Sequence, residues 1–158
     1  MFNDINILNQ IPNSEIYCPA SYNELKNIID EYMNSENKIF FVRLNLECFD
    51  LNKNIKFEEY EYCPTLLSTG WMTNMYLENK DKLKNINIKH FNSLKDLYSY
   101  ADENYSFFVF DQINLYSKFK FKGIDKEPKT FENWEDALNY YNLTIDEIVQ
   151  WITTWSEK

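Results

Sequence analysis

Apolar side chains recur with the period of an α-helix after Ser21. Ser21 and Glu24 form a capping box, which satisfies two backbone donors at a helix start. The apolar positions that follow, spaced to share one helix face, are Leu25, Ile28, Ile29, Tyr32 and Met33. The spacing predicts a helix over residues 22–34 that buries this face.

The next stretch alternates between apolar and polar side chains. In residues 38–49 one face carries Phe40, Val42, Leu44, Leu46 and Cys48. This period of two predicts a half-buried strand. Residues 50–54 are typical of a turn, and residues 55–63 are then predicted to be the hairpin partner, ended by Pro64.

The middle of the chain gives weaker patterns. Residues 65–80 fit either a loop with a strand or a short helix. Beyond them we predict a strand at 85–91, a helix at 94–103, a central strand at 106–111, a strand at 113–121 that pairs with it, and a loop at 122–129.

Two helices are predicted to close the chain. The first ends near Tyr141, Asn142 can adopt the left-handed conformation after it, and Thr144 with Glu147 caps the second. Spacing and turn length resemble a helix-turn-helix. The outward residues of the second helix are acidic and polar, however, which opposes phosphate binding. We therefore predict a packed αα-hairpin.

Together these elements predict an α+β fold in a single domain, residues 1–158. It has a mostly antiparallel sheet, an N-terminal helix, a middle helix and the C-terminal αα-hairpin. A doubly wound parallel sheet is the second choice. Only two glycines occur, Gly70 and Gly123, and this scarcity at strand-to-helix turns disfavours it.

The formal net charge is −9, although residues 79–130 are rich in lysine. Such a charge disfavours nucleic acid as a direct ligand and favours a protein partner with a basic surface. The N-terminus lacks a signal-peptide pattern, no apolar run is long enough to span a membrane, and Cys18, Cys48 and Cys63 form no CxxC pair. These features predict a cytoplasmic protein with free thiols.

The inventory of catalytic groups is small. Two glycines cannot build a GxGxxG or Walker A loop. His90 is the single histidine, and its spacing to the cysteines does not suit a zinc site. Asp50 with Glu78 and Lys80 loosely matches a metal-dependent nuclease, but Glu-x-Lys occurs three times in the chain. We therefore expect no catalytic residue, no metal and no cofactor.

Acidic side chains alternate with aromatic ones in two segments, and the second closing helix adds two more acids. Tyrosine and tryptophan are frequent at interface hot spots, and carboxylates complement a basic surface. The predicted partner-binding residues are Glu58, Glu59, Tyr60, Glu61, Tyr62, Glu132, Glu135, Asp136, Asp146 and Glu147.

In size, acidity and aromatic content the chain resembles small acidic anti-defence proteins (anti-CRISPR and antirestriction proteins) and immunity proteins for nuclease toxins. The resemblance is one of type and involves no shared motif. It implies a non-enzymatic, stoichiometric inhibitor that clamps the catalytic domain of a CRISPR-associated or other nuclease through the acidic and aromatic surface. The alternatives are an immunity protein, a small carboxylate- or metal-dependent enzyme using Asp50, Glu78 and Lys80 or His90, and an assembly module without inhibitory function.

Overall fold

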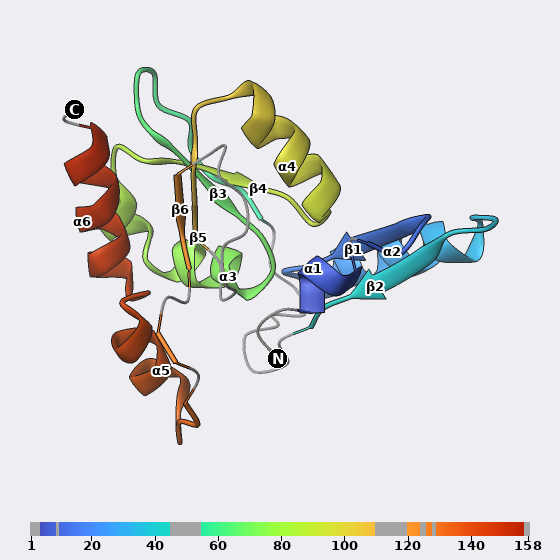
Figure 1. The fold of residues 1–158 in the computed structure, drawn as a ribbon. Helices are drawn as coiled ribbons and strands as arrows, with labels where there is room; N and C mark the ends of the chain where they lie inside the picture. The colour runs from blue at the N-terminus through green and yellow to red at the C-terminus, as the bar shows by residue number, and fades with distance from the viewer. Residues whose placement is uncertain are drawn as a thin grey trace.

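A computed structural model describes residues 4–8, 10–44, 55–109, 120–123, 126–127 and 129–156 (Figure 1). The elements are α1 (Asp4–Leu8), β1 (Ser14–Tyr17), α2 (Tyr22–Met33), β2 (Ile39–Val42), β3 (Thr65–Ser68), α3 (Trp71–Glu78), the 3₁₀ helix η2 (Lys80–Leu83), β4 (Asn87–His90), α4 (Leu94–Glu103), β5 (Phe107–Val109), β6 (Lys120–Lys122), α5 (Trp134–Tyr141) and α6 (Ile145–Ser156).

The strands form two sheets, and every strand pair in them is parallel. One sheet has the order β1-β2, and the other has the order β4-β3-β5-β6. Helix α2 connects β1 to β2, α3 with η2 connects β3 to β4, and α4 connects β4 to β5. The prediction of a mostly antiparallel α+β sheet is therefore wrong, and the α/β arrangement that was the second choice is correct.

Asparagine explains why the scarcity of glycine was misleading. Within the described ranges, five non-glycine residues have positive φ, and four of them are Asn13, Asn37, Asn85 and Asn142, with φ between 56° and 67°. Asparagine tolerates the left-handed conformation because its short side chain can hydrogen-bond locally. The first three stand in loops directly before or close to β1, β2 and β4, so turns of a parallel fold are made here without glycine.

Successive residues of the central strands point into two different cores. On β3, Leu66 packs with the residues of α3, α5 and α6, whereas Leu67 packs with those of α4 and β1. On β5, Phe107 and Val109 face the first core and Phe108 faces the second. Helices therefore cover both faces of the four-stranded sheet, with α6 on one side and α4 on the other (Figure 1).

The predicted helices are confirmed. They could be predicted because the residues that cap them are close together in the sequence. The Ser21 hydroxyl accepts a hydrogen bond from the Glu24 N–H, and Ser93 caps α4 in the same way from Asp96. At the start of α6, the N–H and the hydroxyl of Thr144 both donate hydrogen bonds to the Glu147 carboxylate. Asn142 ends α5 at φ 56° and ψ 42°. None of the helices in the described ranges is both long and apolar enough to cross a lipid bilayer.

The predicted hairpin of residues 38–49 and 55–63 is wrong. Strand β2 covers residues 39–42 and pairs with β1, while residues 55–62 run beside the edge strand β4 without forming a strand. The Asn87 side chain holds them there, since it accepts from the Tyr60 N–H at 2.6 Å and donates to the Tyr60 carbonyl at 2.8 Å. Cys48 and the predicted turn at 50–54 lie outside the described residues.

Two of the remaining strands follow the predictions in position: β4 lies within 85–91, and β5 lies within 106–111 as a central strand. β6 shares only residues 120 and 121 with the strand predicted at 113–121, whose other residues lie outside the described part of the chain, and it pairs with β5 in parallel. Residues 65–80, which the pattern left open, form β3 and α3.

Candidate functional site

Polar side chains meet where β3 and β4 end, at the start of α2 and α3. His90 Nε2 lies 2.7 Å from Glu24 Oε1, and His90 Nδ1 lies 2.7 Å from Thr73 Oγ1. Thr73 Oγ1 lies in turn 3.1 Å from Ser68 Oγ. The carboxyl ends of parallel strands are where α/β proteins place their ligand sites, so this chain of groups is a candidate catalytic site by position.

An acid, an imidazole and a hydroxyl in sequence resemble a nucleophilic triad, but burial excludes that role here. Ser68 and Thr73 are both fully buried, so a substrate cannot reach either oxygen. Segment 18–21 covers them: Gly70 N–H and the Thr69 hydroxyl both donate to the Cys18 carbonyl, and the Asn74 amide donates to the Ala20 carbonyl. The network joins α2 to the four-stranded sheet and has a structural role.

The Thr73→Val substitution should lower the free energy of unfolding by about 1–3 kcal/mol. Valine keeps the shape of threonine but leaves His90 Nδ1 and Ser68 Oγ without this hydroxyl partner in a buried site. Urea denaturation measures the change. The matched control is Thr153→Val on the exposed face of α6, where we expect a change below about 0.5 kcal/mol. Equal effects at the two positions would contradict a structural role for the network.

A second polar cluster lies between α2, β1 and the start of α4. The Tyr17 hydroxyl donates to Glu15 at 2.6 Å, and Lys38 forms an ion pair with Glu15 at 2.9 Å. The hydrogen bond from Tyr17 and the Lys38 ammonium hold the pKa of Glu15 below its usual range, while burial and then Glu15 raise the pKa of Tyr17. A pocket of about 270 Å³ opens here, lined by Asn27, Ile28 and Glu31 of α2 and by Lys95 and Asp96 of α4.

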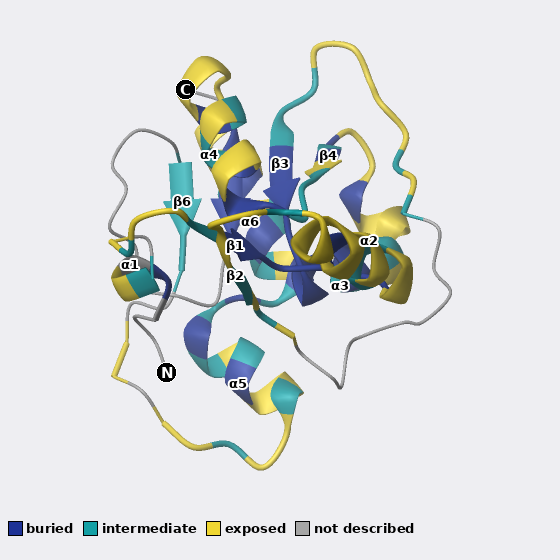
Figure 2. Ribbon diagram, turned by 90° about the vertical axis from the view of Figure 1, so that its right-hand side faces the viewer, coloured by how far each residue is buried: buried dark blue, intermediate teal, exposed yellow. Residues whose placement is uncertain are grey.

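The predicted buried face of α2 is largely open in the structure. Of its five apolar positions only Ile28 is fully buried, whereas Ile29, Tyr32 and Met33 are 49%, 50% and 74% exposed. On β2 and just after it, Val42 and Leu44, which share the predicted apolar face, are also exposed. Figure 2 shows α2 coloured mostly as exposed.

These exposed side chains come from neighbouring elements of the β1-α2-β2 unit. Tyr32 packs on Phe40 with ring centroids 5.5 Å apart, and Phe40 shares its face of β2 with Val42. We call Ile29, Tyr32, Met33, Val42 and Leu44 the open face. Seven of the twelve exposed large apolar residues within the described part of the chain lie between residues 22 and 44, so the concentration is specific to the β1-α2-β2 unit.

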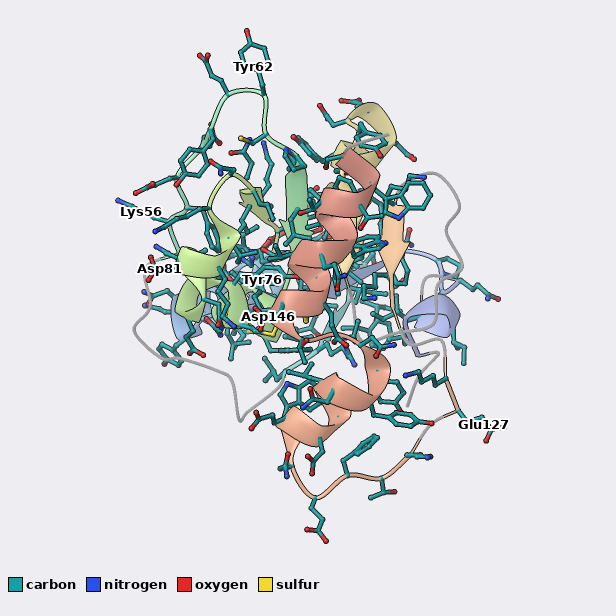
Figure 3. All side chains as sticks on the ribbon, turned by 90° about the vertical axis from the view of Figure 1, so that its left-hand side faces the viewer. Lys56, Tyr62, Tyr76, Asp81, Glu127 and Asp146 are labelled. Atoms are coloured by element: carbon teal, nitrogen blue, oxygen red, sulfur yellow. The ribbon has the colours of Figure 1, made fainter. Side chains whose placement is uncertain are left out.

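The acidic residues predicted to bind a partner come from three separate segments, and all of them except the half-buried Glu147 are exposed. Glu58, Glu59, Tyr60, Glu61 and Tyr62 lie in segment 55–62, and Tyr62 points outward from its tip (Figure 3). Glu132, Glu135 and Asp136 lie just before and at the start of α5, far along the chain. Asp146 forms an ion pair with Lys82 of η2 at 2.8 Å, and Glu147 caps α6.

Lysines lie among these acids and reduce the negative field. Besides Lys82, Lys80 and Lys84 line a pocket of about 300 Å³ with Glu58 and Tyr60, and Lys80 donates to the Lys56 carbonyl. The Tyr60 hydroxyl donates to Glu58 at 2.7 Å, and this hydrogen bond raises the pKa of Tyr60. The proposed basic partner of these residues stays a prediction.

The described residues of the predicted carboxylate enzyme come from opposite ends of β4. Asp50 lies outside the described residues, Glu78 and Lys80 lie before β4, and His90 lies at its other end beside Glu24. No group of three or more His, Cys, Asp or Glu side chains in the described ranges is arranged to hold a metal ion.

Comparison with known proteins shows a fold and no family. No protein-family model matches the chain, and no curated protein matches it. Among solved structures it is similar to a split-gene transketolase in an inactive β4 tetramer, with a TM-score of 0.68 and 17% identity over 97% of this chain and 60% of that one. It is also similar to transketolase from Campylobacter jejuni subsp. jejuni NCTC 11168, with a TM-score of 0.68 and 15% identity over 97% of this chain and 28% of that one.

The chain therefore has an α/β fold like that of transketolases and spans less than two thirds of either of these solved chains. The prediction of a nuclease inhibitor or immunity protein is contradicted, because the proteins that share the fold are enzymes of another kind. Acidity and aromatic content suggested that function because both are visible without knowledge of the fold. The aromatic residues instead serve mainly the two cores, as Phe107, Phe108 and Tyr76 illustrate.

Proposed function

We propose that this chain is an assembly subunit of a transketolase-like protein, in which a second polypeptide covers the β1-α2-β2 unit. The open face is the observation that carries the proposal. Its residues have the amphipathic spacing of a buried helix face and strand face, and the described chain leaves them exposed.

The form of the β1-β2 sheet supports this proposal. Parallel sheets occur almost only where both faces are covered, and sheets of fewer than three strands are rarely stable alone. This sheet has two strands, and β2 has β1 as its strand neighbour within the described ranges. A second polypeptide that covers the open face would remove apolar surface from water, which favours association by about 25 cal/mol per Å².

The similar solved chains give the proposal its context. One of them is a split-gene transketolase in an inactive β4 tetramer, so a chain of this fold can assemble without being active by itself. We propose the same division for this chain: it provides structure to an assembly, and none of its described residues is catalytic. We also propose a cytoplasmic location, which the free thiol at Cys63 supports.

Replacing Ile29 and Met33 together by glutamate should abolish assembly. Both side chains are exposed, so the fold should change little in stability, whereas two carboxylates buried in an apolar interface should weaken association about a hundredfold or more. Light scattering after size exclusion, on the chain alone and co-expressed with transketolase-like chains of its own organism, measures the mass. We expect the wild type in a larger complex and the variant as a 19.2 kDa monomer.

Tyr62→Glu is the matched control, because Tyr62 is fully exposed and lies outside the open face. It should assemble as the wild type does. A wild type that stays monomeric in both experiments, or equal behaviour of the two variants, would overturn the proposed function.

A further inference from the structure

The outer edge of β2 faces away from β1, and none of the described strands lies beside it. Ile39 N–H donates to the Asn13 carbonyl and Arg43 N–H to the Tyr17 carbonyl, so the odd-numbered residues of this segment face β1. Successive residues of a strand point their N–H and C=O groups to opposite edges. The groups of Phe40 and Val42 therefore point away from β1, toward an edge where the described residues place no strand.

The open side of α2 lies above the same edge. Asn27, Ile28 and Glu31 face α4 across the pocket beside Lys95, on the side of the four-stranded sheet. Each residue turns the helix by about 100°, so Ile29 and Met33, two positions from Glu31, lie on nearly the opposite side. Apolar side chains of the helix and the backbone groups of the strand that point away from β1 thus lie on the same side of the unit.

Charge restricts what can bind at this edge. Two copies of a chain with net charge −9 repel each other over most of their surfaces. Residues 37–44, with the sequence NKIFFVRL, hold two cations and no acid. This is the part of the β1-α2-β2 unit where a second acidic copy meets the least repulsion.

The segment is also complementary to itself in one antiparallel register. If Phe40 pairs with Val42 of a second copy, Phe41 lies opposite its own equivalent on the twofold axis. Lys38 then lies opposite Leu44, and Arg43 lies opposite Ile39. No charged residue faces a like charge, which would be destabilising.

The helices fit the same arrangement. Helix α2 covers β1 and β2, so its copy would lie about two strand spacings away, roughly 9–10 Å. Packed helices are about 8–10 Å apart, and the side chains between the two axes would include Ile29 and Met33 of both copies.

Resting on the proposed function, we infer that the partner at this edge is a second copy of the chain. The two β2 strands pair antiparallel about a twofold axis at Phe41. The product is a four-stranded sheet in the order β1-β2-β2-β1, with the two α2 helices side by side on one face.

Cysteine cross-linking tests this register in full-length protein in which Cys48 and Cys63 are replaced by serine. In a non-hydrogen-bonded antiparallel pair the two Cβ atoms are about 4.5–5.5 Å apart, close enough for a disulfide after a small adjustment. Phe41→Cys should therefore form a covalent dimer under mild oxidation. Ile39→Cys is the matched control: it is more exposed, but its copy would lie four residues away, about 13 Å, and should not cross-link.

The backbone groups are tested separately. Val42→Pro removes an outward N–H without breaking the bonds between β1 and β2, and should reduce dimer formation at least tenfold, whereas Val42→Thr keeps the N–H and should retain the dimer. Stronger cross-linking at residue 39 than at residue 41, or dimers that tolerate Val42→Pro, would overturn the inferred pairing. If either of these results is found while the Ile29 and Met33 glutamate variant still loses assembly, the inferred β2 pairing is overturned and the proposed function stands.

Discussion

Phe107→Ala should lower the free energy of unfolding by about 3–5 kcal/mol. Phe107 is fully buried in the central strand β5 and packs edge to face against Trp151 of α6, with ring centroids 5.3 Å apart. Removing the ring leaves a cavity between the sheet and α6, because neither β5 nor α6 can shift far enough in the close-packed core to fill it. The midpoint of urea denaturation measures the loss.

Tyr105→Ala is the control for Phe107. The Tyr105 ring touches the same phenylalanine, with centroids 5.6 Å apart, but Tyr105 is 69% exposed. We expect a loss below about 1 kcal/mol for this variant. Comparable losses at the two positions would mean that the core between β5 and α6 is less tightly packed than the structure shows.

Gly70→Val should cost about 3 kcal/mol, and Gly70→Ala somewhat less. Gly70 has φ 54° and ψ −137°, a conformation that residues with a Cβ atom rarely adopt, and a β-branched residue is the least tolerant of positive φ. The backbone is fixed there because Gly70 N–H donates to the Cys18 carbonyl at 2.8 Å and the residue begins α3.

Conformation, and not space, sets this cost. A Cβ atom on Gly70 would lie 3.4 Å from the Cys18 Cβ, which is an ordinary contact. Thermal or urea denaturation of the alanine and valine variants should therefore rank them wild type, alanine, valine in decreasing stability. An alanine variant as stable as the wild type would contradict the positive φ.

The helices could be predicted from the sequence because the signals are local. A capping box and an apolar stripe lie within one or two turns, so Ser21 and Thr144 marked two helix starts correctly. The alternation at residues 38–49 similarly marked β2. Its pairing could not be read, since a parallel partner is reached through a whole helix and leaves no turn signal next to the strand.

The candidate site shows the same division. The sequence pattern placed Ile29, Tyr32, Met33, Val42 and Leu44 on apolar faces that should be buried. It could not show that these side chains stay exposed in the described structure. Conversely, the hydrogen-bond partners of His90 could not be predicted from the sequence, because Glu24 and Thr73 lie 66 and 17 residues away along the chain.

The sequence by itself determined where α2, α4 and α6 begin, which faces are apolar, and that glycine-based phosphate loops are absent, since each follows from neighbouring residues. The tertiary structure alone decided that the strands are parallel, that Ser68 and Thr73 beside His90 are buried and structural, and that the β1-α2-β2 unit keeps an open face. Those properties depend on contacts between distant segments, and burial, unlike spacing, is a property of the assembled chain.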